Sequence, residues 1–571
     1  MQELKQKQYG PKLPISEETH MRKHRLTGET FREAMSRIAG ALTDGPIHFY
    51  AYREILLDQR FLPAGRVQSA VGSPRKVTAF NCYVSRTIED SMDGIMDAAH
   101  EAANTMRLGG GIGYDFSTIR PRHDTIVSLD SKSSGPISFM DIFNSVCKTI
   151  ASAGQRRGAQ MGVLRVDHPD IEEFIEAKSN STNLTQFNIS VGVTDEFMRA
   201  VEAGTDFNLT FNGRVYKRVD ARLLWDKMMR ATWDWAEPGI LFIDRINEMN
   251  NLWYCETIAA TNPCGEQPLP PYGACLLGSF NLVKYLLREG NGSYVFDYDA
   301  LVADVPHVVR AQDNIIDNTV YPLPQQELEA KTKRRMGLGY TGLANAGEAL
   351  GYPYGSPKFL RFQREVSRLL VNEVYRASAM LAKEKGAFPL YDARFLDGKF
   401  VAKLDQDVFD LIAKHGIRNS HLISIAPTGT ISLTADNVSS GCEPVFSHFY
   451  DRTIIDDNGN GKVERVSDYG YRELGVKGKT ADGCTVDEHL SVLVLASEWV
   501  DSAVSKTLNV GSDVTWEDFK SIYMTAWKMK CKGATTFRAA GKRYGVLNKA
   551  DTPDDSTACF IDPSTGLKSC E

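Results

Sequence analysis

The segment around Cys264 combines three side chains that could do chemistry together. Pro263 and Gly265 disfavour the interior of a regular helix or strand. In a locally extended loop, Asn262, Cys264 and Glu266 would point to the same side, because successive side chains alternate. An amide that can hold a hydroxyl, a thiol that can lose a hydrogen atom and a carboxylate that can take a proton would then surround one small volume. The alternative interpretation is a packed turn with a buried cysteine.

The other cysteines differ in their surroundings. Cys82 and Cys275 lie in apolar, strand-like segments, where a single cysteine is more often a packing residue than a catalytic one. Cys559 and Cys570 lie on a polar tail that could not bury them well, and thiol–disulfide exchange is a use that fits such thiols. No Cys-x-x-Cys pair and no metal-ligand cluster is visible, which disfavours a zinc ribbon. The ten cysteines are Cys82, Cys147, Cys255, Cys264, Cys275, Cys442, Cys484, Cys531, Cys559 and Cys570.

One segment has the composition of a phosphate-binding loop. Pro427, Thr428, Gly429, Thr430 and Ser432 follow a strongly apolar stretch. Such a loop can present backbone N–H groups and hydroxyls to a phosphate, and the alternative is an ordinary strand-to-helix turn.

Two glycine-rich segments match nucleotide-binding patterns only in part. Gly337–Gly342 fits the dinucleotide fingerprint, but basic residues rather than a strand precede it. Gly109–Gly113 is not followed by the lysine and hydroxyl residue of a Walker loop. Close approach of the backbone to a ligand or helix is therefore the favoured interpretation of Gly109–Gly113.

The elements that must position these residues follow an alternating pattern. Residues 1–75 are predicted to be helical, with apolar residues at helical spacing between Glu29 and Leu42. From about residue 76 to 450 the chain alternates short apolar runs with amphipathic stretches, among them predicted helices at 139–153 and 358–385, and this alternation predicts α/β architecture. Residues 550–571 are rich in Asp, Ser, Thr, Pro and Gly, which predicts a mobile tail.

Composition narrows the class of protein. The chain has 571 residues and a net charge of −6, which argues against non-specific binding of a nucleic-acid polymer. The N-terminus is polar, without the apolar segment of a secretory signal, and no run of roughly 18 apolar residues predicts a membrane span. We therefore expect a cytoplasmic protein whose cysteines are mostly thiols.

Several motifs together resemble ribonucleotide reductase. They are Asn-x-Cys-x-Glu at 262–266, Ala-Cys-x-Leu-Gly-Ser-x-Asn-Leu at 274–282, Arg-Phe-Leu-Pro-Ala-Gly-Arg at 60–66, Asn-Cys at 81–82, Arg-Leu-Gly-Gly-Gly-Ile-Gly at 107–113 and Ala-Pro-Thr-Gly-Thr-Ile-Ser at 426–432. The resemblance covers roughly residues 25 to 571, and the motif wording is closest to the adenosylcobalamin-dependent class. It implies a ten-stranded α/β barrel of two five-stranded parallel halves at 76–549, with a catalytic finger loop, an N-terminal helical region at 1–75 and a C-terminal redox tail at 550–571.

The resemblance also implies roles for single residues. Cys264 would carry the thiyl radical that abstracts the 3′-hydrogen, Glu266 would deprotonate the 3′-hydroxyl, and Asn262 would bind the substrate. Cys82 and Cys275 would be the dithiol that becomes a disulfide, and the tail cysteines would reduce it again. The implied substrate-binding residues are Asn81, Gly110, Gly111, Pro427, Thr428, Gly429, Thr430 and Ser432, and the implied effector-binding residues are Asp141, Arg156, Arg157, Lys178 and Asn180.

Partners follow from the same resemblance. They are a ribonucleotide substrate, a deoxynucleoside triphosphate effector, a thioredoxin- or glutaredoxin-like reductant and a second copy of the chain in a homodimer. The N-terminal region is too short for the ATP-binding cone of the family, so overall activity regulation is not expected.

The sequence leaves two possible sources of the radical open. Thr536 and Phe537 stand where the class with a separate metal-containing, ferritin-like subunit has a Tyr-Tyr pair, which favours adenosylcobalamin. The alternative is a catalytic subunit that takes its radical from such a partner. A glycyl-radical acyltransferase-like enzyme and a non-enzymatic nucleotide sensor are the alternatives from other classes, and turnover of a ribonucleotide with a dithiol would separate them.

Overall fold

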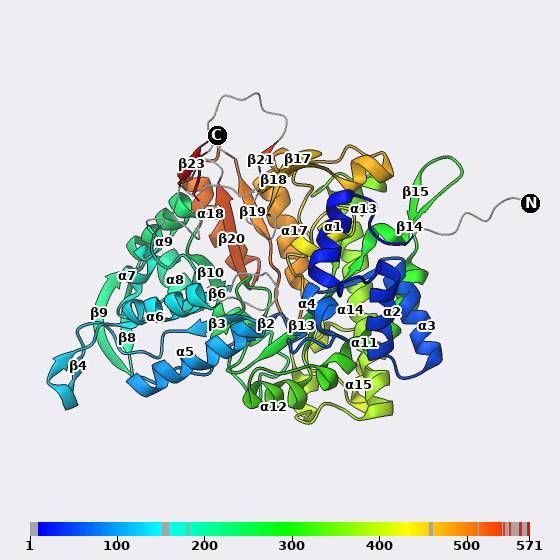
Figure 1. Cartoon of the computed structure of the whole chain (residues 1–571). Coiled ribbons are helices and arrows are strands. Elements are labelled where there is room, and N and C mark those ends of the chain that lie inside the picture. The colour runs from blue at the N-terminus through cyan, green and yellow to red at the C-terminus, as the bar shows by residue number, and fades with distance from the viewer. Residues whose placement is uncertain are drawn as a thin grey trace, which may run out of the picture.

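The computed structural model describes residues 9–150, 159–179, 182–455, 461–511, 513–538, 541–542, 548–549, 559–561 and 568–570. The chain begins with helices that pack beside the main body (Figure 1). A capping box, in which Thr30 and Glu33 bond reciprocally to each other's backbone N–H groups, starts the second helix, and this helix buries Phe31, Met35 and Ile38 on one face. The predicted N-terminal helical region is therefore observed over its described residues as α1 Pro14–His24, α2 Phe31–Leu42, α3 Pro46–Leu57, β1 Phe61–Pro63 and α4 Gly65–Ala70.

Five parallel strands form the first half of a large sheet. Neighbours pair in the order in which they occur in the chain, and helices or hairpins connect them. The strands are β2 Cys82–Val84, β3 Gly111–Asp115, β6 Gln160–Arg165, β7 Phe187–Val193 and β10 Gly239–Phe242. The intervening elements are α5 Met92–Arg107, β4 Thr125–Ile126, β5 Ser131–Lys132, α6 Pro136–Thr149, α7 Ile171–Glu176, α8 Asp195–Ala203, β8 Asp206–Phe211, β9 Arg214–Asp220 and α9 Ala221–Trp235.

A second parallel set follows along the chain. It contains β13 Ala274–Asn281, β16 Met336–Thr341, β19 Thr507–Val510 and β20 Gly533–Arg538. Residues 422–425 lie between β16 and the segment leading into β19, through parallel bridges from Leu338 to Ile423 and from Ile425 to Val504. The helices of this part include α11 Tyr298–Asn318, α12 Pro324–Lys333, α13 Leu343–Ala349, α14 Pro357–Lys385, α15 Gln406–His415, α16 Gly429–Thr434, α17 Val486–Glu498 and α18 Trp516–Lys528.

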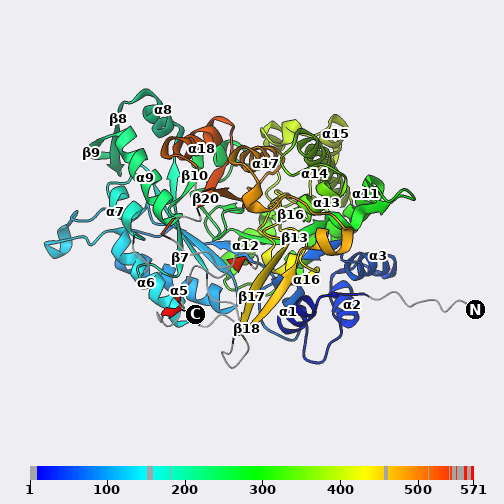
Figure 2. The same ribbon diagram turned by 90° about the horizontal axis from the view of Figure 1, so that it is seen from above.

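Antiparallel junctions join the two halves. β2 pairs with β13 at one junction, and β10 pairs with β20 at the other. Together with the bridges at residues 423 and 425, these junctions connect ten described segments into a ring, and β1 pairs with residues 278–280 of β13. Figure 2 shows β7, β10 and β20 across from β13 and β16. The predicted ten-stranded α/β barrel with two five-stranded parallel halves is therefore confirmed.

A short hairpin enters the ring. Its strands are β11 Ala260–Thr261 and β12 Pro268–Leu269, and we call residues 260–269 the finger. The finger touches both halves, since Asn188 of β7 bonds to it from one side and Ser424 from the other. Contacts with opposite walls place the finger inside the barrel.

Glycines allow backbones to approach one another here. A Cβ on Gly113 would lie 1.8 Å from the carbonyl oxygen of Thr261, and a Cβ on Gly339 would lie 2.3 Å from that of Ser424. The close approach expected at Gly109–Gly113 is an approach to the finger at Gly111 and Gly113, whereas Gly109 and Gly110 lie against the side chains of Arg66 and Tyr83. Gly337 and Gly339 lie within β16 rather than after a strand, as a dinucleotide fingerprint would require.

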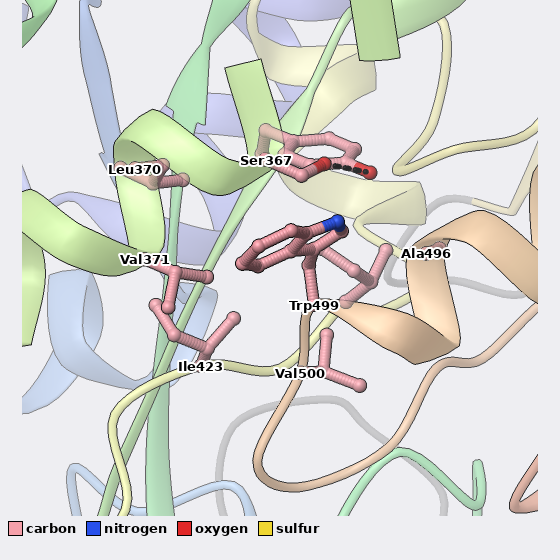
Figure 3. A pocket seen from close by; sticks show the side chains of 9 residues that line it. Ser367, Leu370, Val371, Ile423, Ala496, Trp499 and Val500 are labelled. Carbon is pink, nitrogen blue, oxygen red and sulfur yellow. Dashed lines mark hydrogen bonds between the residues drawn. The ribbon is translucent and has the colours of Figure 1, made fainter. Parts of the chain in front are cut away.

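A small cavity lies behind the barrel wall, between the 422–425 segment and two helices (Figure 3). Ser367 of α14 and Trp499 after α17 are among its few polar residues, and the Ser367 hydroxyl bonds to the Tyr340 hydroxyl at 3.4 Å. Its other lining residues are aliphatic, so this cavity belongs to the helix–sheet core and is separate from the finger. No helix of the described residues is long and apolar enough to cross a membrane.

Several buried histidines should make stability sensitive to acid. Burial lowers the pKa of His168 to about 4, whereas in the unfolded chain a histidine titrates near 6.5. Below pH 6.5 the unfolded state binds the extra proton, so stability falls as the pH is lowered towards 4. His168→Gln should therefore reduce the stability difference between pH 7.5 and pH 5.5 by about 1 kcal/mol, measured by urea denaturation. The exposed His100→Gln is the control, and equal pH dependence of the two variants would contradict the prediction.

Candidate active site

The loop of the finger is built on the side chain and backbone of Asn262. Its Oδ1 accepts a hydrogen bond from the Gln267 amide at 2.9 Å, its own amide donates to the Gln267 carbonyl at 3.0 Å, and its carbonyl accepts from the Gly265 amide at 3.1 Å. Gly265 has a φ of +81°, a conformation that favours glycine. These bonds place Cys264 at the tip of the loop, where it is exposed while Pro263 and Glu266 are buried.

Cys82 and Cys275 lie opposite each other at the junction of the two halves. They are register partners in the antiparallel pair of β2 and β13, and both are buried. Directly opposed residues have Cα atoms about 4.5–5.5 Å apart, which falls within the range of a disulfide, about 4.4–6.8 Å. In the structure both are thiols, and the backbone holds them in a geometry that permits a disulfide.

The finger brings polar groups to this cysteine pair. The Asn262 Nδ2 donates to the Cys82 sulfur at 3.1 Å, and the Cys82 thiol donates to the Glu266 Oε1 at 3.8 Å. Residues separated by about 180 positions in sequence thus form one buried cluster of amide, thiol and carboxylate. Asn262 and Glu266 both contact Cys82, but the loop between them is a turn and not the extended segment expected, and Cys264 is exposed at its tip.

Burial sets the protonation state of the two thiols. It raises the pKa of Cys82 well above its ordinary value, and the charge of Glu266 adds to this effect. Burial likewise raises the pKa of Cys275, although the nearby Arg335 guanidinium opposes the shift. Both sulfurs are therefore protonated at neutral pH, so they are suited to donate hydrogen and not to act as thiolate nucleophiles.

Arg335 is a residue that the sequence motifs did not single out. It is buried immediately before β16 and forms ion pairs with Glu256 and Glu329, whose side chains are also buried. A buried cation is retained only when carboxylates compensate it. The sequence does contain one signal for Arg335. Three consecutive cations, Lys333, Arg334 and Arg335, stand directly before an apolar strand, a position at which a solvent-exposed surface does not require cations.

Topology gathers the other predicted substrate residues at one end of the ring. Because the halves are antiparallel, the amino ends of β2 and β3 lie with the carboxyl ends of β13 and β16. Asn81, Gly110 and Gly111 therefore share an end of the barrel with Thr341 and the loop that follows residue 425. The Asn81 Oδ1 is buried without a hydrogen-bond partner among the described residues.

The candidate phosphate loop passes into a short helix. Pro427 and Thr428 precede α16, whose residues include Gly429, Thr430 and Ser432. Thr428 adopts a left-handed conformation, and its hydroxyl bonds to Thr341 at 3.0 Å and accepts from the Gly441 amide at 2.8 Å. This hydroxyl fixes the loop and does not cap the first turn of the helix. The backbone is a strand-to-helix turn, which is compatible with phosphate binding at its amides.

The predicted effector residues are only partly described. Asp141 is exposed on α6, and Lys178 forms an ion pair with Glu237 at 2.6 Å. Arg156, Arg157 and Asn180 lie outside the described residues. In the tail, the backbones of Cys559 and Cys570 face each other in the hairpin of β22 Cys559–Ile561 and β23 Lys568–Cys570, and their side chains lie outside the described part.

Comparisons with known proteins agree with this geometry. The family model described as ribonucleotide reductase, barrel domain, matches residues 80–537. A vitamin B12-dependent ribonucleoside-diphosphate reductase of Mycobacterium tuberculosis (strain CDC 1551 / Oshkosh) is 36% identical over 530 residues, which cover 87% of this chain and 73% of that protein. The protein of the same description from Thermoplasma acidophilum is 33% identical, with 92% of this chain and 70% of that protein covered. A vitamin B12-dependent ribonucleotide reductase of Streptomyces clavuligerus is 29% identical, with 90% and 62% covered.

The fit between finger and barrel can be tested at Gly113. Gly113→Ala places a methyl group 1.8 Å from the Thr261 carbonyl oxygen, so the finger has to shift. We expect a loss of stability on the order of 1–3 kcal/mol and faster reaction of the buried Cys82 with a thiol reagent. Gly192→Ala, also on a barrel strand but with its nearest neighbour 3.7 Å away, is the matched control. Equal stability and thiol reactivity in the two variants would show that the finger does not depend on this approach.

Proposed function

The chain belongs to the ribonucleotide reductase family, and we propose on this premise that it reduces ribonucleoside diphosphates to 2′-deoxyribonucleotides through a radical on Cys264. The observation that carries the proposal is the cluster at the finger. Cys82 and Cys275 are a buried pair of opposed thiols, and Cys82 contacts a carboxylate and an amide on the loop that exposes Cys264. Two electrons, a proton acceptor and a hydrogen-atom shuttle are then available in one place.

The proposed reaction balances with these groups. A thiyl radical on Cys264 takes the hydrogen atom from C3′, forming its S–H bond, while the Glu266 carboxylate takes the proton of the 3′-hydroxyl. The 2′-hydroxyl leaves as water with a proton from one of the two buried thiols. The other thiol gives the hydrogen atom that forms the new C2′–H bond, and Cys82 and Cys275 join in a disulfide. The remaining electron of the pair and the proton held by Glu266 restore the 3′-hydroxyl, and the Cys264 thiol then returns its hydrogen atom to C3′. The sum converts a ribonucleotide and a dithiol into a deoxyribonucleotide, a disulfide and water.

The protonation states support these roles. A leaving hydroxyl needs a proton donor, and burial keeps the Cys82 and Cys275 thiols protonated. The amide of Asn262 contacts Cys82 and would also hold a substrate hydroxyl. Phosphate would bind at the backbone of Thr428, Gly429 and Thr430, at the end of the barrel that also holds Asn81.

Adenosylcobalamin is the proposed radical source, because the relatives above are named as vitamin B12-dependent. When bound, the cofactor supplies the carbon radical that removes the hydrogen atom from the Cys264 thiol. The residues present fit such a group, since Cys264 is exposed at the tip of its loop, whereas Cys82 and Cys275 are buried. The alternative is a radical delivered by a separate ferritin-like, metal-containing subunit.

Regulation and reductant complete the proposal. A deoxynucleoside triphosphate effector would bind near Asp141, Arg156 and Arg157 at the interface of a homodimer. The loop that contains Lys178 and Asn180 would communicate to the substrate site which effector is bound. Cys559 and Cys570 would exchange with the Cys82–Cys275 disulfide and be reduced in turn by a thioredoxin- or glutaredoxin-like protein.

The decisive experiment is turnover by the purified chain with a ribonucleoside diphosphate, a small dithiol and adenosylcobalamin. We expect deoxynucleotide with the cofactor and none without it. Cys264→Ser should abolish product, because a hydroxyl is a poor hydrogen-atom shuttle, while Cys255→Ser, at an exposed cysteine outside the finger residues, should retain activity. No turnover with the cofactor, but turnover after addition of a ferritin-like partner, would reverse the assignment of the radical source.

The tail is tested by changing the reductant. Cys559→Ser and Cys570→Ser should keep turnover with a small dithiol, which can reach the barrel, and lose most turnover with thioredoxin. The ratio of the two rates for each variant is the measurement. An equal loss with both reductants would rule out a relay by the tail.

A further inference from the structure

Two carbonyl groups flank Cys264 on the finger, and the barrel wall holds both. The Pro263 carbonyl accepts a hydrogen bond from the Asn188 Nδ2 at 2.9 Å. The Glu266 carbonyl accepts from the Ser424 hydroxyl at 3.0 Å and from the Ala503 amide at 3.0 Å. Asn188 belongs to the first half of the barrel and Ser424 to the second. The short segment that carries Cys264 is therefore held from opposite walls.

Asn188 is an unusual residue for its position. It lies in β7 between Phe187 and Ile189, which are buried, and it is itself exposed. Because side chains alternate along a strand, Asn188 faces the interior of the ring, where the finger lies. Asparagine has a low propensity for strands and is therefore unexpected in such an apolar run. Its hydrogen bond to the finger accounts for its presence.

The Pro263–Cys264 peptide has little freedom as a result. The Pro263 ring lies against Gly111 of β3, where a Cβ would be 3.2 Å from the Pro263 Cγ, and the Pro263 carbonyl is held by Asn188. The Cys264 sulfur then moves mainly by rotation about its own side-chain bonds. Hydrogen-atom transfer depends steeply on the separation of the reacting atoms, so this fixation affects the rate.

Asn188 also lies directly after the loop at residues 182–186. The Gln186 amide donates to the Asn144 Oδ1 of α6 at 3.0 Å, and the Ile189 amide donates to the Glu237 carboxylate at 3.2 Å. These bonds fix both sides of Asn188 along the chain.

We propose that Asn188 and Ser424 are positioning residues that set the place of the Cys264 thiol. This placement is a matter of geometry alone. Its consequence for catalysis rests on the proposed function, in which Cys264 carries the radical.

The geometry is tested without turnover, by the rate at which iodoacetamide alkylates Cys264, followed by peptide mass spectrometry. Asn188→Leu has a similar size but no donor, and it should increase the alkylation rate of Cys264 at least threefold by releasing the loop. Cys255, which is also exposed, is the reference thiol within the same molecule. Asn208→Leu, at an exposed strand position in β8, is the matched control. An unchanged rate in Asn188→Leu would overturn the proposal.

Steady-state kinetics test the consequence. Asn188→Leu and Ser424→Ala should each lower kcat on the order of tenfold, with KM for the ribonucleotide within twofold of the parent value. Ser424→Thr, which keeps the hydroxyl, should restore most of the rate. Ser367→Ala removes another buried hydroxyl outside the finger and should leave kcat unchanged. A rise in KM with normal kcat would instead make Asn188 a substrate contact and overturn the positioning role.

The two experiments separate the two levels of inference. If the parent protein shows no reductase activity, the proposed function fails, while the alkylation rates still decide whether Asn188 positions Cys264. If the parent is active and Asn188→Leu matches it in both assays, the positioning role fails and the proposed function stands.

Discussion

The finger carries peptide groups into the middle of the barrel, where each buried N–H and C=O group needs a hydrogen-bond partner. Asn262 provides partners within the loop through its bonds to Gln267 and Gly265. The barrel provides the others, through Ser424 and the Ala503 amide on one wall and Asn188 on the other. Both halves of the barrel therefore bind the same hairpin. Its backbone comes so close to the barrel strands that only glycine fits at the contact.

Burial gives the same region its chemistry. Removal of water keeps the Cys82 and Cys275 thiols protonated, so the pair stores two reducing equivalents without becoming a reactive thiolate. Burial destabilises charged groups. The Arg335 guanidinium near Cys275 is compensated by ion pairs with the carboxylates of Glu256 and Glu329. Cys264, in contrast, is exposed at the tip of the loop, where a radical source and a substrate can reach it.

Elements outside the barrel hold the ends of the site. The Ser16 hydroxyl of α1 bonds to the Leu433 carbonyl at 2.6 Å, and the Gln59 side chain bonds to the Thr434 carbonyl at 3.2 Å. These carbonyls are at the carboxyl end of α16, where the Leu433 carbonyl also accepts from the Asn437 amide at 3.2 Å. The N-terminal helices thus support α16 from behind, while its amino end and the preceding loop face the barrel.

The fold class and the residue types of the site can be read from the order of amino acids alone. Alternating apolar runs indicate α/β architecture, and Asn262, Cys264 and Glu266 are readable together because they are close in the chain. Periodicity also predicts the helices at 31–42 and 357–385, apart from small shifts at their ends. Cys82 and Cys275, however, are separated by almost two hundred positions, and each alone resembles a packing cysteine. Only the antiparallel junction of the two halves decided that they face each other, because strand register is set by tertiary pairing and not by local sequence. The same reason applies to the roles of Asn188, Ser424 and Arg335, which only the tertiary structure shows. Their partners are distant in the chain and come close only because the barrel closes around the finger.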